Sequence, residues 1–211
     1  MKIRIIFTFL GAICLLNQAQ AQFAVGTKML GLNFGYSSQE NGATQNKNSS
    51  TMVAPEVYFF PAENYAIGGS FLIMKQEISS PSGIIGTVEE RTSKGLSLGG
   101  RIFTKGDHAF KFYANPALVI VFTDGQNLRG NTIESTVRGN AGGFVLGSGF
   151  IYMINNTMGI DFSTGPIVSF LGSSTTTVGD GNNDPVTNSF TDFKIMPNGL
   201  SNLTIGFNYF F

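Results

Sequence analysis

The sequence predicts an all-β fold, an eight-stranded antiparallel up-and-down transmembrane β-barrel. Three observations predict it: apolar residues alternate with period two, short and long connections alternate, and only 12% of the 211 residues are charged. That fraction is about half of the roughly 25% usual in globular proteins, so we expect much of the surface to avoid water. Beyond the N-terminal segment, no run reaches the about 18 apolar residues that a membrane helix needs.

The N-terminus predicts export. Lys2 and Arg4 precede an apolar stretch over residues 5–16, and Ala19 and Ala21 form a small-x-small cleavage pattern, which is the layout of a secretory signal peptide. We therefore expect residues 1–21 to be the signal peptide and residues 22–211 to form the barrel. An uncleaved anchor helix is the alternative, but the apolar stretch is too short for one.

Residue counts after cleavage exclude two kinds of chemistry. The single cysteine, Cys14, lies in the signal core behind Ile13, where a lipoprotein site would have a small residue; the mature chain therefore has no disulfide and no thiol. Removal of Lys2 and Arg4 leaves 11 of the 13 basic residues against 13 acidic ones, a net charge of −2. No basic patch remains for nucleic acid.

Alternation marks each expected strand. In residues 28–37 one face carries only large apolar side chains, namely Leu30, Leu32, Phe34 and Tyr36. The same pattern predicts strands at about 51–60, 65–74, 96–102, 110–120, 142–152, 158–163 and 202–211. Strands of about ten residues match the roughly 9–11 that cross a bilayer at a tilt.

Charged residues follow the opposite phase of these strands. The inward face carries Glu56, Arg101, Lys111 and Asp161, whereas the outward face carries no charge away from the strand ends. A Lys or Arg facing lipid at mid-bilayer costs about 2–4 kcal/mol. Since Arg101 and Lys111 are nearly symmetric about Gly106, we expect them to be neighbours on adjacent strands. Because an unpaired buried charge is costly, we expect the four to form a charged cluster that fills the periplasmic half of the lumen, rather than a selectivity filter.

The connections alternate strictly in length. Short turns are expected at Pro61–Asn64, Lys105–His108 and Asn155–Asn156, and long loops rich in Ser, Thr, Asn and Gly at about 38–50, 75–93, 124–135 and 172–190. Outer-membrane barrels have this asymmetry, with short periplasmic turns and long extracellular loops. A soluble secreted β-protein remains the alternative.

Three sites, one of them a pair of glycines, disturb the pattern. Gly142 and Gly143 predict a β-bulge, and Pro55 and Pro116 predict bulges or strand ends because proline lacks the N–H of the ladder.

Three segments carry a family resemblance: Pro55–Phe60, Asn64–Gly69 and Gly206–Phe211. With the whole mature pattern, they resemble the eight-stranded outer-membrane β-barrel family of the outer-membrane protein A transmembrane-domain type. The resemblance implies the outer membrane of a Gram-negative bacterium, contact with outer-membrane lipid, and unidentified extracellular partners for the long loops. It further implies an assembly signal, read by the barrel-assembly machinery, in Ile205, Phe207, Tyr209 and Phe211; an ordinary apolar strand at a chain end is the alternative.

The residues give little support to catalysis or metal binding. The one histidine, His108, lies beside Asp107 in a short turn, and no Ser-His-Asp set or histidine cluster is visible. The segment from Asp180 to Asp184 has closely spaced oxygen ligands but lacks the terminal glutamate of a calcium loop. We therefore expect no catalytic residue, no metal and no cofactor.

The sequence thus favours a non-enzymatic integral outer-membrane β-barrel with a structural or surface-interaction role. A narrow channel or carrier for small or hydrophobic solutes is the alternative, and an enzyme acting on envelope lipid ranks third.

Overall fold

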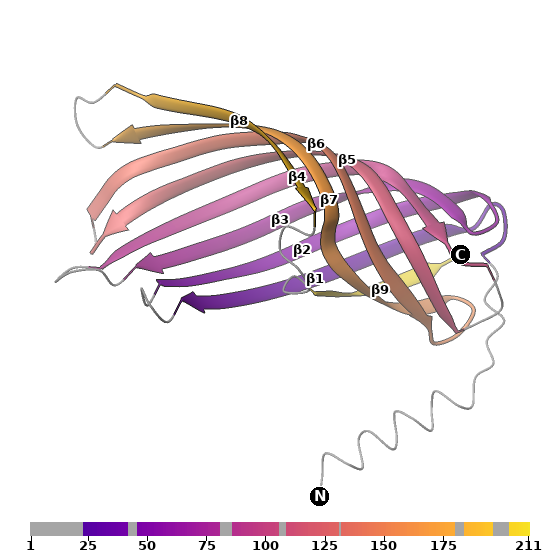
Figure 1. Cartoon of the computed structure of the whole chain (residues 1–211). Coiled ribbons are helices and arrows are strands. Elements are labelled where there is room, and N and C mark those ends of the chain that lie inside the picture. The colour runs from indigo at the N-terminus through magenta and orange to yellow at the C-terminus, as the bar shows by residue number, and fades with distance from the viewer. Residues whose placement is uncertain are drawn as a thin grey trace, which may run out of the picture.

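The computed structural model describes residues 23–41, 46–80, 86–105, 109–130, 132–179, 184–195 and 203–211. They form nine antiparallel strands: β1 (Lys28–Asn41), β2 (Asn46–Ala62), β3 (Tyr65–Ser80), β4 (Thr87–Phe103), β5 (Phe110–Arg129), β6 (Thr132–Met153), β7 (Met158–Gly179), β8 (Val186–Ile195) and β9 (Thr204–Phe210). Strands that follow one another in the chain pair with one another from β1 to β8 (Figure 1). Within the residues just given, no helix is long and apolar enough to span a membrane.

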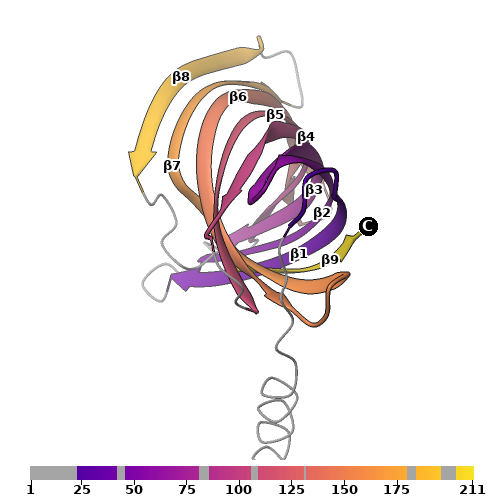
Figure 2. The same cartoon turned by 90° about the vertical axis from the view of Figure 1, so that its right-hand side faces the viewer.

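Eight strands form a closed ring. β9 pairs on one side with β1 over Met29–Gly35 and on the other with β7 over Met158–Ser163, and β6 pairs with β7, so β1 to β7 and β9 surround a common interior (Figure 2). The predicted eight-stranded antiparallel barrel is therefore confirmed. β8 is an additional strand that continues the wall along the outer part of β7, over Val168–Thr177.

The outer wall carries the apolar face of each strand. Its exposed side chains are mostly Leu, Ile and Phe, for example Leu98 (60% exposed) and Leu118 (65%). Five rings pack side by side over β5, β6 and β7 near the short turns, with centroids 4.9 to 6.0 Å apart: Phe110, Phe112, Phe150, Tyr152 and Phe162. An apolar belt with an aromatic girdle at its edge is typical of transmembrane barrels.

Charged side chains mark the other edge of this belt. On the outward faces of β3, β4 and β5, the exposed residues Lys75, Lys94 and Asp124 follow directly on Ile73, Leu96 and Phe122, and exposed Arg138 of β6 lies beside Asp124. The register aligns them, since Lys94 lies opposite Phe122 and Asp124 lies opposite Arg138. The belt is therefore bounded by charge at the end away from the short turns, as the phasing of the sequence predicts.

The strands continue well beyond the belt. β1 to β7 have 14 to 22 residues, so most residues of the four expected long loops are paired strand, and that part of the prediction is wrong. Hydroxyl groups bond across the extensions, as in Ser37–Ser50 (2.9 Å), Ser93–Thr123 (2.8 Å) and Thr176–Thr187 (2.9 Å). Threonine is β-branched and favours strands, although runs of Ser and Thr are also typical of loops.

The expected irregularities are confirmed only in part. Pro55 and Pro116 lie in mid-strand without a register shift, so neither marks a bulge or a strand end. The pairing of Pro55 with β3 and of Pro116 with β4 is nevertheless interrupted, as the missing N–H predicts. Gly142 and Gly143 pair in continuous register; the shift in β6–β7 comes between Leu146 and Ser148, opposite residues 164–168. Those residues contain Gly165-Pro166, and the missing N–H of Pro166 accounts for the break.

Candidate functional site

The lumen near the short turns contains three ionisable side chains from three strands, which we call the ionic cluster: Glu56 (β2), Arg101 (β4) and Asp161 (β7). Arg101 Nη2 lies 2.7 Å from Glu56 Oε2, and Nη1 lies 2.8 Å from Asp161 Oδ2. All three side chains are at most 3% exposed. One guanidinium therefore joins two carboxylates across the interior of the barrel.

Neutral groups complete the ionic cluster. Tyr113 Oη donates to Asp161 Oδ1 at 2.7 Å, and Asn208 Nδ2 donates to Asp161 Oδ2 at 3.2 Å. The Arg101 guanidinium lies over the rings of Tyr58 (4.8 Å) and Tyr113 (4.4 Å), a cation–π geometry. Asp161 thus accepts hydrogen bonds from three residues, which offsets the loss of water that its complete burial entails.

Two glycines give these side chains room. A Cβ on Gly31 would lie 2.3 Å from Asn208 Oδ1 and 2.5 Å from Glu56 Oε1. A Cβ on Gly206 would lie 1.8 Å from Asn33 Oδ1. Because real Cβ atoms do not approach so closely, any larger residue at either position would displace the polar side chains of the lumen.

Lys111 is buried (1% exposed), but it is not a cross-strand neighbour of Arg101. The register places Phe103 opposite Tyr113 and Lys111 opposite Ile151 of β6. Its Nζ lies 6.0 Å from the centre of the Phe23 ring. The expected adjacency of Arg101 and Lys111 is therefore wrong, although both face the lumen as predicted.

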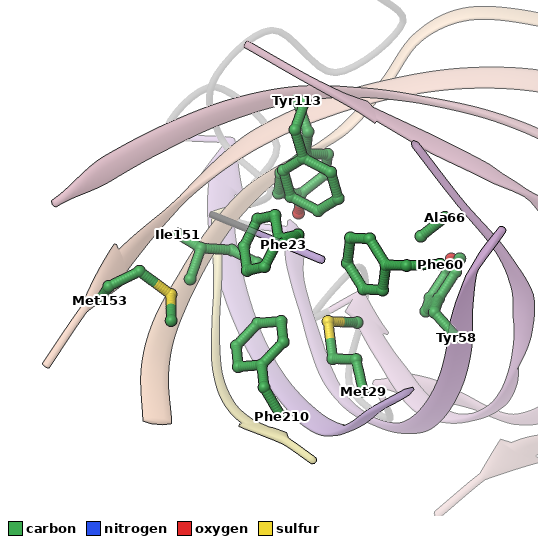
Figure 3. Close-up of a cluster of buried hydrophobic side chains, with 10 residues drawn as sticks. Phe23, Met29, Tyr58, Phe60, Ala66, Tyr113, Ile151, Met153 and Phe210 are labelled. Carbon is green, nitrogen blue, oxygen red and sulfur yellow. The ribbon is translucent and has the colours of Figure 1, made fainter. Parts of the chain in front are cut away.

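Ten buried side chains pack on the short-turn side, and we call them the hydrophobic cluster (Figure 3): Phe23, Met29, Tyr58, Phe60, Ala66, Phe103, Tyr113, Ile151, Met153 and Phe210. The Phe23 ring lies at their centre, 4.8 Å from Phe60, 4.8 Å from Phe103 and 4.9 Å from Phe210 between ring centroids. Tyr58 and Tyr113 belong to this cluster and also contact Arg101, so the two clusters adjoin.

Phe23 precedes the first strand and is held by a short turn. Gly26 N donates to Phe60 O (2.8 Å), and Phe60 N donates to Thr27 O (2.9 Å). Gly26 has φ +92°, a conformation that favours glycine. Alternation could not reveal Phe23, because it applies only within strands; the one signal in the sequence is an aromatic residue at the second position after the expected cleavage site.

On the other side of the ionic cluster the lumen contains a partly open cavity of about 310 Å³. Glu56, Arg101 and Asn115 line its end. Most of the remaining lining surface is apolar and comes from side chains such as Met52, Leu72, Met74, Val119, Val121 and Val145, with Ser and Thr side chains between them, among them Ser70, Ser97, Ser148 and Thr164. Among the described residues, Asn33 Oδ1, Glu56 Oε1, Arg101 Nε and Asn115 Oδ1 are buried without a hydrogen-bond partner. An apolar wall with a few convergent polar groups is typical of ligand pockets.

The other sequence candidates divide between described and undescribed residues. Ile205, Phe207, Tyr209 and Phe211 all point outward, 45 to 61% exposed, and their role as an assembly signal stays a prediction. Ala19, Ala21, His108 and most of 180–184 lie outside the described residues. Within the described part, no group of three or more His, Cys, Asp or Glu residues could hold a metal ion.

Neither the models of known families nor the curated proteins give a match to this sequence. Among solved structures, a major outer membrane protein from Thermus thermophilus is similar at 11% identity, with a TM-score of 0.50, over 88% of this chain and 99% of that one. The outer membrane protein OprG from Pseudomonas aeruginosa is 13% identical, with a TM-score of 0.49, over 92% and 98%. Neisserial surface protein A is 10% identical, with a TM-score of 0.36, over 87% and 96%.

At such identities the Thermus likeness concerns the fold. With the closed antiparallel ring and the outward apolar belt, it defines a small integral β-barrel of the outer-membrane type. The fold that the sequence resemblance implies is thereby confirmed. The belt argues against the soluble alternative, because it would expose dozens of large apolar side chains to water.

Proposed function

We propose that this protein is a non-enzymatic outer-membrane barrel whose lumen is closed, and that it acts as a structural and surface-interacting element of the envelope. One observation carries the proposal: the ionic and hydrophobic clusters lie one behind the other across the same stretch of lumen. An eight-stranded barrel has an interior just wide enough for side chains to fill or for one small ligand, so it has no room for an open channel past both clusters. A solute could pass only by breaking both Arg101 ion pairs and displacing Phe23.

The surface role rests on the strand extensions. β5 continues from Phe122, in the apolar belt, to Arg129, which corresponds to about 20 Å at the rise of a strand. The extensions of β3 to β7 are paired hairpins with Ser, Thr and Asn side chains. In the usual orientation of outer-membrane barrels they lie outside the cell, so they are suited to contact extracellular partners.

Conductance in planar bilayers tests the closed lumen. The folded wild-type barrel should give no steady channel, whereas the double variant Phe23→Ser, Arg101→Ser should conduct, because it shortens side chains in both clusters. Heat-modifiable gel mobility would establish that each sample is folded. Steady unitary conductance of the wild type would contradict the proposal.

The proposal that the protein is not an enzyme has a separate test. His108→Ala should leave the lipid and lipopolysaccharide composition of the producing cell's envelope unchanged. A change restored by the wild-type gene would favour the enzyme instead.

A second candidate function, a carrier for small hydrophobic molecules, is favoured by the cavity. Its wall of Met, Leu and Val side chains is unusual for a barrel lumen, which is ordinarily polar. A small molecule could bind at this apolar wall without an open path through the barrel. The carrier function is therefore compatible with a closed lumen.

A further inference from the structure

We propose that the lumen cavity is a binding site for a small uncharged amphipathic molecule, an aliphatic alcohol whose hydroxyl group meets the Arg101–Glu56 pair. This site deepens the second candidate function, the carrier, by naming the class of its ligand. It does not depend on the closed-barrel function, because a ligand could enter and leave on one side of the ionic cluster.

The cavity wall determines the chemistry of the apolar part of the ligand. Met52 of β2, Leu72 and Met74 of β3, and Val119 and Val121 of β5 supply the side chains that line it. Methionine is flexible and polarisable, so it adapts to aliphatic ligands of different shape. At about 310 Å³ the cavity is at the lower end of the range for small-molecule pockets, roughly 300–1,000 Å³, which limits the ligand to a small molecule.

The polar end of the cavity determines the chemistry of the ligand's head. Arg101 and Glu56 use Nη2 and Oε2 for their ion pair. Arg101 Nε, a donor, and Glu56 Oε1, an acceptor, are both buried without a partner among the described residues. Glu56 and Arg101 both line the cavity, so the proposal places the ligand's hydroxyl group at this ion pair, where it would donate to Oε1 or accept from Nε.

Charge balance argues for an uncharged head. In the part of the chain that the structure describes, the buried ionisable side chains of the lumen are Glu56 and Asp161, which are acidic, and Arg101 and Lys111, which are basic. Their formal charges cancel, so an ammonium or carboxylate head would bring an uncompensated charge next to these buried side chains. A hydroxyl adds a donor and an acceptor without a charge.

The methionines provide the readout. In the folded chain in lipid nanodiscs, labelled with ¹³C at the methionine methyl groups, 1-octanol should shift the Met52 and Met74 signals in a saturable manner. Met29 and Met153 of the hydrophobic cluster should not shift, and the outward Met158 should report only partitioning into the bilayer. Octane, octylammonium and octanoate should bind at least ten-fold more weakly than 1-octanol.

Two variants on β5 complete the test. Val121→Phe fills the cavity and should abolish the saturable shift, whereas Ile120→Phe adds similar bulk to the lipid-facing side and should leave it intact. Shifts that rise linearly at every methionine, Met158 included, would mean partitioning only and overturn the proposal. Equal affinity for octane would overturn the role of the Arg101–Glu56 pair, and the absence of any shift at Met52 and Met74 would remove the site altogether.

Discussion

Arg101 Nη2 and Glu56 Oε2 lie 2.7 Å apart, although their strands, β4 and β2, are separated by β3. The contact is possible because β3 presents small residues at this height: Ala66 lies opposite Arg101, and Gly68 lies opposite Tyr58. The guanidinium therefore extends over β3 to Glu56 and across the lumen to Asp161. A single basic side chain thus links β2, β4 and β7.

Removal of Arg101 should be strongly destabilising. Arg101→Met leaves two buried carboxylates without their cation, and breaking a buried pair in this way typically costs about 3–5 kcal/mol. Urea unfolding of the barrel in lipid vesicles measures the loss. Arg138→Met is the matched control, because Arg138 and Asp124 form an exposed pair 3.9 Å apart, for which we expect at most about 1 kcal/mol. Equal losses in both variants would mean that burial of the Arg101 pair contributes nothing to stability.

The direction of each lumen side chain could be predicted from the sequence, but the neighbours of each could not. The expected adjacency of Arg101 and Lys111 assumed a hairpin centred on residue 106, whereas Phe103 pairs with Tyr113, which centres it on residue 108. That difference shifts the register by four residues. Because side chains alternate with period two, an even shift keeps every residue on its face and changes only its partners.

Other features depend on information that alternation does not contain. Phe23 lies outside every strand, and its burial depends on a turn at Gly26 and on rings contributed by three distant strands. The composition of the strand extensions suits loops as well as strands. Their pairing depends on long hairpins that hold hydroxyl groups opposite one another, as in Thr176–Thr187. Tertiary contacts therefore determine both the burial of Phe23 and the pairing of the strand extensions.

The hydroxyl group of Tyr113 should contribute measurably to stability. Tyr113→Phe keeps the ring under Arg101 but removes the 2.7 Å hydrogen bond to Asp161. Hydrogen bonds to charged groups contribute about 1.5–3 kcal/mol, and we expect a loss in that range by the same unfolding measurement. The control is Tyr36→Phe, on the exposed outer face of β1, which should change stability by less than about 0.5 kcal/mol. If Tyr113→Phe were as stable as the wild type, Asp161 would not need this hydrogen-bond donor.

Gly31 should not tolerate a methyl group. In Gly31→Ala the Cβ would meet Asn208 Oδ1 and Glu56 Oε1, at 2.3 and 2.5 Å, so both side chains must move and the ionic cluster must distort. Overpacking of this kind costs about 1–3 kcal/mol. In the control Gly172→Ala the nearest atom to the new Cβ is Gly142 O at 3.9 Å, an ordinary contact, and stability should change little. If both variants were equally stable, the space at Gly31 would not matter to the ionic cluster.

A charge on the lipid-facing side should distinguish the belt from the strand extensions. Leu98 is 60% exposed in the middle of the outward apolar run of β4, whereas Val178 is 40% exposed at the far end of β7, beyond the charged residues that bound the belt. Leu98→Arg should destabilise the folded barrel by about 2–4 kcal/mol, because the arginine faces the bilayer interior, and Val178→Arg by no more than about 1 kcal/mol. Unfolding from vesicles gives both values. The difference between the two variants should vanish in a detergent micelle thin enough to let the introduced guanidinium reach water. The reason is that the cost comes from the depth of the charge in the hydrocarbon, not from any contact within the protein. Equal losses in vesicles would mean that the membrane does not lie where the apolar belt predicts.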